Sequence, residues 1–452
     1  MGESFLWFET ALLPTGWSGR VRLTLAEGRI AAVATGVEPQ AGDHRGQVAV
    51  PGLPNLHSHA FQRAMAGLAE VRGPSCDSFW TWRELMYRFV ARLGPDEVEA
   101  IAALAFMEML ESGFTRVGEF HYLHHAADGS IFADPAEMAA RIAAAADDTG
   151  IGLTLLPVFY AHSGFGGAPP TQGQRRFVTT PDGYARLLEG SRAAVAGLDD
   201  ARVGVAPHSL RAVTEAELVQ ISANASGPIH IHIAEQVREV EDCVAWSGAR
   251  PVQWLLDRFE VDGRWCLVHA THMTADETER LGRSGAVAGL CPITEANLGD
   301  GLFPAPEFLA AGGAFGIGSD SNVRIDAVEE LRLLEYGQRL STCTRNVLAE
   351  TEGGSTGGAL YGRAQAGGAQ ALGRPEGLVE GCSADLVVLD ETRPELAARS
   401  GDAALDAYVF VGGSRLVKDV WRAGRKVVEG GRHHARDRIV TRYRSALRRL
   451  LA

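Results

Sequence analysis

The middle of the chain constrains the fold most strongly, because short apolar runs alternate there with longer segments of helical pattern. Helical patterns such as 96–112 and 135–150 separate the runs. Strands that alternate with helices form parallel β/α units. Together with the run that leads into His59, roughly eight strands result, which predicts a closed (β/α)8 TIM-like barrel. No Gly-x-Gly-x-x-Gly turn follows the first of these strands, which argues against a dinucleotide-binding fold. The apolar runs lie at residues 114–120, 152–160, 203–209, 228–235, 265–272, 286–292 and 314–320.

Both ends of the chain are rich in strand patterns. The first fifty residues alternate apolar and polar positions between glycines, which is typical of antiparallel hairpins. The same texture returns at 384–390, 407–413 and 416–431. We therefore expect residues 1–50 and 379–452 to form one small β-sandwich domain, and residues 51–378 to form the barrel.

Two later segments predict helices. The Gly- and Ala-rich stretch 352–373 has alanines spaced as in a closely packed helix, although a flexible loop is the alternative. Near the C-terminus, one helical face carries Ile439, Tyr443, Ala446 and Leu450, with arginines elsewhere. A basic amphipathic helix can bind membranes, but we expect this one to pack onto the protein's own body.

Composition and charge argue against several classes of partner. The net charge of −13 repels a phosphate backbone, so we expect no nucleic-acid partner. We expect no membrane partner either, because no apolar stretch has the length of a membrane span. The first residues lack a basic segment ahead of their apolar ones, and the six cysteines are scattered without a CxxC pair. Both features predict a cytoplasmic protein with free thiols.

Histidine and aspartate side chains stand where several predicted strands end, which is where a barrel carries its chemistry. Residues i and i+2 of a strand point to the same side, so His57 and His59 can reach one ion. A third imidazole from His232 and a carboxylate from Asp320 complete a set that suits zinc, while ferrous iron or manganese stays open. The residues at the strand ends are His57, His59, His208, His232, His269 and Asp320.

Four motifs resemble those of the amidohydrolase superfamily in its deaminase branch: PGLPNLHSHAFQRAM, HIHIAEQ, LVHATH and GIGSD. The β-rich ends are similar to the superfamily's usual small sandwich domain, so the resemblance covers nearly the whole chain. Within the branch, it is greatest to the N-formimidoyl-L-glutamate deiminases of histidine breakdown. It implies hydrolysis of N-formimidoyl-L-glutamate to N-formyl-L-glutamate and ammonia, with one Zn²⁺ per chain. The segments that carry this finer resemblance are 57–70, 79–87, 118–125, 207–213 and 231–243.

The resemblance also implies catalytic roles. Glu235 would move protons from water to the substrate nitrogen, although a solvated loop carboxylate is the alternative interpretation. His269 would lie across the ion and polarise the attack, and Asp320 would bind the metal and accept a proton. His272 is expected to be structural or to support the site from outside.

A substrate with two carboxylates needs cationic groups, and arginine binds carboxylates bidentately. Arg211 with His208 is the leading candidate, because both directly follow a predicted strand. We expect the nearby histidines to be structural: His121, His124 and His125. The resemblance places these residues around the substrate: Gln62, Arg83, Tyr122, His208 and Arg211.

The distribution of lysine bears on the number of metals. The only lysines are Lys418 and Lys426, near the C-terminus. Binuclear members of the superfamily commonly bridge two metals with a carboxylated lysine, which this barrel cannot supply. A Cys or Glu bridge stays open, but a mononuclear site is the simpler interpretation. The same distribution excludes a lysine Schiff base and a Walker-type phosphate loop in the barrel.

Two other functions stay open at this point. A deaminase of the same fold could act on a nucleobase or nucleoside such as guanine or adenosine, with less dependence on arginine. A non-catalytic scaffold is the third interpretation, although it would have no need for both the ligand set and Glu235. Because barrels of this kind often associate, we expect a homodimer that acts on a small carboxylate-bearing substrate.

Overall fold

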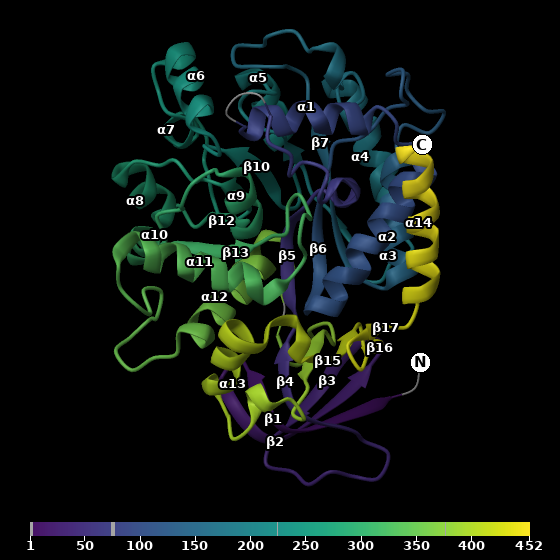
Figure 1. Cartoon of the computed structure of the whole chain (residues 1–452), viewed down its shortest axis with the longest axis vertical. Coiled ribbons are helices and arrows are strands. Elements are labelled where there is room, and N and C mark those ends of the chain that lie inside the picture. Colours follow the sequence, from purple (N-terminus) through teal and green to yellow (C-terminus); the bar gives the residue numbers. More distant parts are fainter. Residues whose placement is uncertain (1–2, 74–76, 224, 376) are drawn as a thin grey trace.

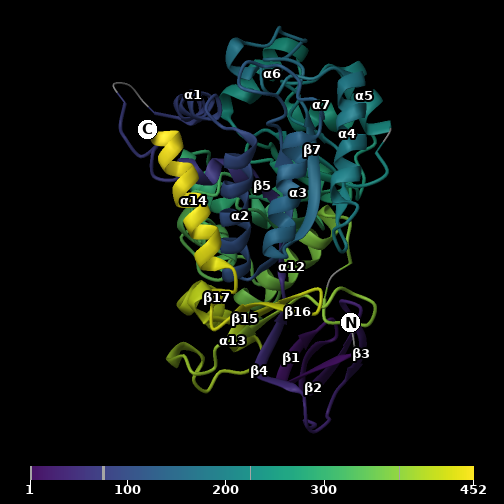
Figure 2. The ribbon, with the colours of Figure 1, turned by 90° about the vertical axis from the view of Figure 1, so that its right-hand side faces the viewer.

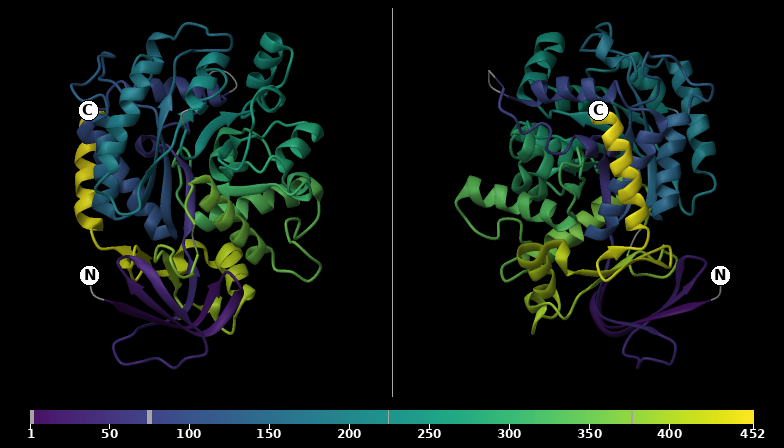
Figure 3. Two further views of the ribbon diagram at one scale, coloured as in Figure 1. Left: turned by 180° about the vertical axis from the view of Figure 1, so that it is seen from behind. Right: turned by 45° about the vertical axis from the view of Figure 1, so that its right-hand side comes forward.

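The computed structural model describes residues 3–73, 77–223, 225–375 and 377–452, and it places a helix-covered barrel above a smaller β-sheet (Figure 1). The purple N-terminal strands and the yellow-green C-terminal strands lie together at one end of the molecule, and Figures 2 and 3 show the same division from other sides. The predicted fold class, a TIM-like barrel with a small β domain from both chain ends, is confirmed.

The barrel strands are parallel and close into a ring. Their order is β10-β11-β12-β13-β5-β6-β7-β8, with β9 paired to β7. Parallel bridges from Val205 to Ile229 and from Ser209 to His232 join the two ends of this order, so eight positions surround the axis. The strands are β5 (Leu53–Ser58), β6 (Phe114–His121), β7 (Gly152–Phe159), β8 (Arg202–Val203), β9 (Ala206–Pro207), β10 (Ile229–Ile233), β11 (Trp265–His269), β12 (Val287–Leu290) and β13 (Ala314–Ile317).

Helices cover the outside of this ring, which explains why its strands are apolar on both faces. Every residue of β5, β6 and β7 is buried, as expected for parallel strands between a core and a helix layer. The segment 352–373 is helical from Thr356 to Ala371, as predicted. The helices are α1 (Phe79–Val90), α2 (Pro95–Ser112), α3 (Glu137–Thr149), α4 (Pro181–Val195), α5 (Glu215–Ala223), α6 (Val237–Ser247), α7 (Pro251–Arg258), α8 (Ala275–Arg283), α9 (Pro292–Leu298), α10 (Ala305–Ala310), α11 (Ala327–Thr342) and α12 (Thr356–Ala371).

The small domain is one sheet with the order β17-β16-β15-β14-β4-β1-β2-β3. The two chain ends meet where β4 pairs with β14 in antiparallel fashion. Leu6, Leu23 and Leu386 pack in its own apolar core. Whether the domains divide at residues 51 and 379 stays a prediction. The strands are β1 (Ser4–Leu13), β2 (Gly16–Ala26), β3 (Arg29–Ala34), β4 (His44–Pro51), β14 (Leu386–Leu389), β15 (Val417–Arg422), β16 (Arg425–Glu429) and β17 (Arg432–His433).

The last helix, α14 (Arg436–Leu451), leaves the small sheet and packs along α2 of the barrel (Figure 2). Ile439, Ala446 and Leu450 are its buried residues, so the expected packing onto the protein's own body is confirmed. No helix in the described ranges combines the length and apolarity that crossing a bilayer requires.

One predicted strand is wrong. The run 407–413 continues α13 (Asp402–Ala407) as a helical turn that ends at Gly412. Consecutive residues Tyr408 and Val409 are buried, whereas a half-buried strand would bury alternate ones. The Tyr408 hydroxyl donates to the carbonyl oxygen of Ser112 at 3.3 Å, beneath the end of α2. A short apolar run does not distinguish a strand from a buried helical turn, and packing against the barrel decides this one.

Candidate active site

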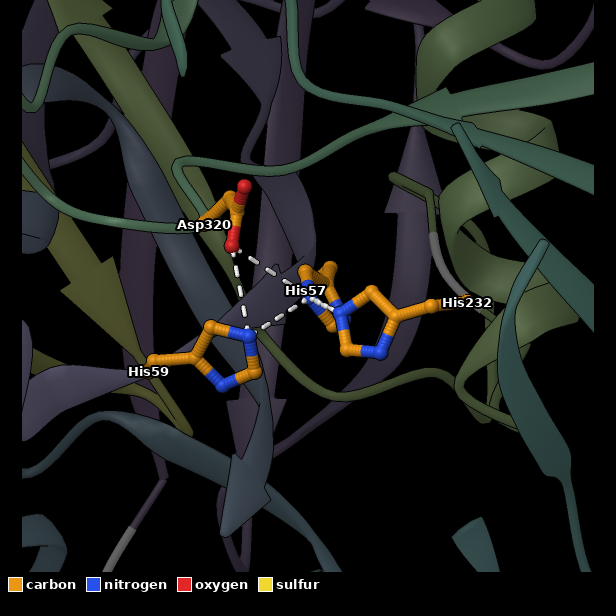
Figure 4. Close-up of side chains that lie close together, drawn as sticks. All are labelled: His57, His59, His232 and Asp320. Atoms are coloured by element: carbon orange, nitrogen blue, oxygen red, sulfur yellow. Dashed lines mark hydrogen bonds and ion pairs between the residues drawn. The ribbon is translucent and has the colours of Figure 1, made fainter. Parts of the chain in front are cut away.

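Four side chains from the ends of three strands meet in the barrel (Figure 4). His57 lies on β5 and His59 directly after it, His232 lies on β10, and Asp320 follows β13. The Nε2 atom of His57 is 3.2 Å from that of His59 and 3.0 Å from that of His232. Oδ1 of Asp320 is 3.5 Å from His57 Nε2 and 3.3 Å from His59 Nε2. The structure therefore brings the four predicted metal ligands together.

These distances fit a shared cation. Zinc ligands about 2.0–2.1 Å from the ion, at the corners of a tetrahedron, lie about 3.3 Å from one another. Nδ1 of His59 is 2.8 Å from the carbonyl oxygen of Phe120, and Nδ1 of His232 is 3.0 Å from that of His208. Each Nδ1 must carry the proton to donate to a carbonyl, so each Nε2 presents its lone pair to the centre.

Burial keeps these imidazoles neutral, which is the form that binds metals. Burial lowers the pKa of His57 to about 3, against the influence of Asp320. It also lowers the pKa values of His59 and His232. Burial alone would raise the pKa of Asp320, but hydrogen bonding to His57 and electrostatic interactions with the neighbouring histidines lower it below its ordinary value, so this carboxylate stays ionised.

The backbone at several strand ends adopts conformations that are rare for residues with side chains. Ala234, His269 and Asp320 have φ angles of 50°, 68° and 43°. Such left-handed residues cost roughly 1–3 kcal/mol each and persist where the surrounding structure holds them, often at functional sites. Here they turn the chain just as each strand ends, and they direct side chains of β10, β11 and β13 toward the same centre.

Glu235 and His269 lie next to this cluster, as predicted. His269 Nε2 is 3.9 Å from Glu235 Oε1 and 3.9 Å from Asp320 Oδ2. Burial raises the pKa of Glu235 to about 7, although His269 and Arg211 oppose the shift. Burial would lower the pKa of His269, but Glu235, Glu295 and Asp320 together raise it to about 10. A carboxyl group with a pKa near neutrality can both accept and release a proton under physiological conditions.

The five predicted substrate residues line the cavity above the cluster. Gln62 donates from Nε2 to the Tyr122 hydroxyl at 2.8 Å, which leaves its buried Oε1 without a hydrogen bond among the described residues. Nε and Nη2 of Arg211 and Nε of Arg83 are also buried, and they too have no hydrogen bond to any residue that the structure describes. His208 lies against the ring of Tyr160, and burial lowers its pKa well below its ordinary value.

Two carboxylates hold Arg211 from a distance. Its Nη2 atom is 3.9 Å from Glu235 Oε2, and its Nε atom is 3.8 Å from Glu239 Oε1. Burial would lower the pKa of Arg211, but these two carboxylates raise it, so the guanidinium stays charged inside the cavity. Nε and Nη2 of Arg211 are too far from these carboxylates for a hydrogen bond, so they remain available to donate to an anionic ligand.

Helix α1 forms the roof of the cavity. Phe79, Trp82, Arg83 and Tyr87 all face it. The guanidinium of Arg83 stacks on Trp80, 4.6 Å from the ring centroid, which orients it at the rim. Phe79, Trp82 and Tyr87 therefore form an aromatic wall of the site.

Several further residues support the site through contacts that the sequence motifs do not indicate. Oε1 of Glu295 lies 3.2 Å from His269 Nδ1 and orients that ring. Arg63 forms a two-point contact with Glu108 at 2.6 and 3.2 Å, and its Nη1 reaches the carbonyl oxygens of Asn322 and Val323. Arg63 thereby links the helical turn that follows His59 to the loop that follows Asp320. Nothing in the local pattern around these residues indicates such long-range contacts.

The remaining histidines fit structural roles. Nε2 of His124 and Nε2 of His125 each lie 2.8 Å from a backbone carbonyl oxygen, those of Val158 and Val178. His121, the last residue of β6, is fully buried. The carbonyl oxygen of His272 accepts a hydrogen bond from Arg250, and this residue does not line the cavity.

Comparison with known families assigns the fold and this site to one group. Residues 48–427 match the model described as the amidohydrolase family, and residues 3–47 match the N-terminal domain of formimidoylglutamate deiminase HutF. The chain belongs to the amidohydrolase family. The predicted resemblance to this family and to formimidoylglutamate deiminases is thereby confirmed, as is the prediction of a hydrolase that acts on carbon–nitrogen bonds.

Individual relatives within the family differ in how similar they are. The chain is 53% identical to the formimidoylglutamate deiminase of Pseudomonas aeruginosa, over 99% of this chain and 100% of the relative. A solved amidohydrolase structure from Brucella melitensis is 56% identical with a TM-score of 0.96, and the match covers 99% of this chain and 100% of that one. An adenosine deaminase from Xanthomonas campestris, solved with bound zinc, has a TM-score of 0.82 at 22% identity over 99% of this chain and 98% of that one, which shows the shared fold alone.

Proposed function

We propose that the chain is a zinc-dependent deiminase that hydrolyses N-formimidoyl-L-glutamate to N-formyl-L-glutamate and ammonia, a step of histidine degradation. The observation that carries the proposal is a pair of arginines, Arg83 and Arg211, whose buried donors have no hydrogen bond among the described residues and which line the same cavity as the cluster of three histidines and one aspartate. A hydrolase for an anionic amidine needs both the arginines, which bind the carboxylates, and the cluster, which would hold the metal. The 53% identity to the deiminase of Pseudomonas aeruginosa supports the same assignment.

The donor set supports zinc as the metal. Three neutral imidazoles and one carboxylate suit this borderline cation, and the spacing of the ligand atoms fits a tetrahedral site. We assign one ion per chain to His57, His59, His232 and Asp320. When bound, such an ion would supply Lewis acidity and lower the pKa of a water molecule toward neutrality.

The chain's own residues would carry the protons. Hydrolysis adds the water oxygen to the formimidoyl carbon and breaks the bond between this carbon and the terminal nitrogen. Both protons that convert this imine nitrogen into an ammonia leaving group come from water. Glu235 takes one proton from the attacking water and delivers it to the nitrogen, and Asp320 receives the second proton before it too is passed on. A Glu235 pKa near 7 suits both steps.

His269 would stabilise the charge that develops during attack. Three carboxylates raise its pKa, so its imidazole carries a proton at neutral pH and can donate from Nε2 toward the reacting carbon's substituents. Glu295 fixes the ring through Nδ1. The position of His269 depends on Glu295 because the hydrogen bond leaves the ring a single orientation.

The substrate carboxylates would bind at the other end of the cavity. Arg211 offers two donors without hydrogen bonds among the described residues, and a bidentate contact with a carboxylate would satisfy both. Arg83, at the rim on α1, would bind the second carboxylate. Gln62, Tyr122 and His208 would hold the backbone of the substrate between the two arginines and the cluster.

Ammonia release from a panel of substrates tests this assignment. N-formimidoyl-L-glutamate, guanine and adenosine would each be incubated with metal-replete protein. We expect rapid ammonia release from N-formimidoyl-L-glutamate alone, with N-formyl-L-glutamate as the other product. Turnover of a purine with none of the acidic amidine would favour the ring-deaminase alternative, and no turnover with no bound metal would favour a scaffold. The homodimer and the cytoplasmic location stay predictions.

A further inference from the structure

A second group of metal-binding side chains lies directly beside the four-residue cluster. Cys291, His269 and Asp320 each contribute one ligand atom, and the three atoms lie within 4.8 Å of one another. Cys291 follows β12 as the residue that precedes α9, and it is a fully buried free thiol. It does not line the substrate cavity, yet its Sγ lies within 4.8 Å of the ligand atoms of His269 and Asp320.

Asp320 is oriented to serve both groups at once. Its Oδ1 atom faces His57 and His59 at 3.5 and 3.3 Å. Its Oδ2 atom faces His269 Nε2 at 3.9 Å instead. A carboxylate whose two oxygens point to different sets of nitrogen ligands can bridge two cations.

Glu295 holds the other two members of the group in place. Its Oε1 atom accepts a hydrogen bond from the backbone nitrogen of Cys291 at 3.0 Å, and it lies 3.2 Å from His269 Nδ1. A carboxylate that binds the outer nitrogen of a histidine is the usual support of a metal-binding imidazole. The same carboxylate thus orients one ligand and anchors the backbone of another.

We propose that Cys291, His269 and Asp320 form a second, weaker site for a thiophilic divalent cation such as zinc, and that occupation of this site inhibits the enzyme. Thiolate and imidazole ligands select zinc over magnesium or calcium. Binding is weaker than at the first site because three side chains rather than four supply ligands and because two cations repel each other at this distance. Inhibition follows because His269 and Oδ2 of Asp320 then bind the second cation, and it rests on the roles proposed above for these residues.

Metal titration of the chelated full-length protein tests the site without reference to substrate. Zinc bound per chain would be measured by mass spectrometry after equilibrium dialysis, and cobalt would be added in parallel to record the thiolate-to-metal charge-transfer band. We expect a first equivalent without the band and a second equivalent with it. Activity should reach its maximum at the first equivalent and fall by about 10²-fold as the second binds, since a lost general acid–base group costs at least that much.

Cys291→Ser is the decisive variant, because serine keeps the size of the side chain but not the thiolate. We expect it to bind one equivalent, show no charge-transfer band and keep full activity in excess zinc. Cys266→Ser, at another fully buried cysteine on β11, and Cys343→Ser, at an exposed one, should behave like the unmodified protein. A cooperative thermal unfolding transition would show that each variant is folded. If Cys291→Ser does not fold, Cys291→Ala would be used in its place.

Two outcomes overturn the second site: a single equivalent up to saturating zinc, or a second equivalent and band that persist in Cys291→Ser. The proposed function fails separately. Two equivalents with the band but no turnover of N-formimidoyl-L-glutamate would keep the site and reject the substrate. Turnover of N-formimidoyl-L-glutamate by protein that binds only one equivalent of zinc, even at saturation, would keep the substrate and reject the second site.

Discussion

The two ends of the active-site cavity are built differently. At the metal end, His59 and His232 come from strand ends, and each has its outer nitrogen against a backbone carbonyl oxygen. At the substrate end, Arg83 comes from a helix and Arg211 from a loop, and both keep buried donors without hydrogen bonds among the described residues. The metal end is thus oriented by the protein alone, whereas the substrate end has hydrogen-bonding capacity left for an anion.

This difference predicts two kinds of mutational effect. Changes at the metal end should remove metal or lower kcat, because the ligands and proton carriers are held in place by the barrel. Changes at the substrate end should raise KM and relax selectivity while the metal stays bound. A substitution at the substrate end that removes the metal, or one at the metal end that only raises KM, would contradict this division.

The largest effect is expected for His232→Ala. Without this ligand the cluster should lose its metal, and activity should fall by more than about 10⁴-fold, since the metal supplies most of the activation of water. Metal analysis and ammonia release would be measured together. His230→Gln is the matched control, because His230 lies two residues earlier on the same strand and bonds to the carbonyl oxygen of Ala371, away from the cluster. An equal loss of metal and activity in both variants would indicate a general structural defect of β10.

Glu235→Gln should come next. The variant keeps the shape of the side chain but cannot carry a proton, so kcat should fall by about 10²–10⁴-fold while one metal stays bound. The pH profile sharpens the test. Glu235 must be ionised to accept a proton, and burial raises its pKa to about 7, so the activity of the unmodified protein should fall as the pH drops below that value. The exposed Glu241 on α6 provides the control, and Glu241→Gln should retain both rate and profile.

Arg211→Met should separate the two ends most clearly. Loss of a buried charged contact to a carboxylate costs about 2–5 kcal/mol, so kcat/KM for N-formimidoyl-L-glutamate should fall by at least about 30-fold, mainly through KM. Metal content should not change. Arg238→Met, at an exposed arginine near the same rim, should have little effect. A variant at position 211 that lost its metal would contradict the division between the two ends.

The smallest effect is expected for Arg63→Lys. Lysine keeps the charge but cannot hold both Glu108 and the carbonyl oxygens of Asn322 and Val323. We expect about tenfold weaker metal binding in competition with a chelator, because residues that orient the ligand loops typically contribute that much. Arg186→Lys, an exposed arginine on α4, should leave metal affinity unchanged.

The sequence was most informative where chemistry follows regular structure. His57, His59, His232 and Asp320 could be predicted because each stands where an apolar run ends, and parallel strands bring such ends to one side of a barrel. Arg63 and Glu295 could not, because their roles depend on contacts between loops that lie far apart in the chain. The run 407–413 shows the same limit for the fold, since its β-branched and aromatic residues match strand propensity and packing against α2 overrides it.

The most direct test of the central claim is ammonia release from N-formimidoyl-L-glutamate by chelated protein, before and after one equivalent of zinc. We predict negligible release before the addition and full activity after it, because the cluster of three histidines and one aspartate would hold the ion that activates water. Equal rates before and after the addition, with metal analysis confirming that the chelated protein is free of metal, would contradict the account.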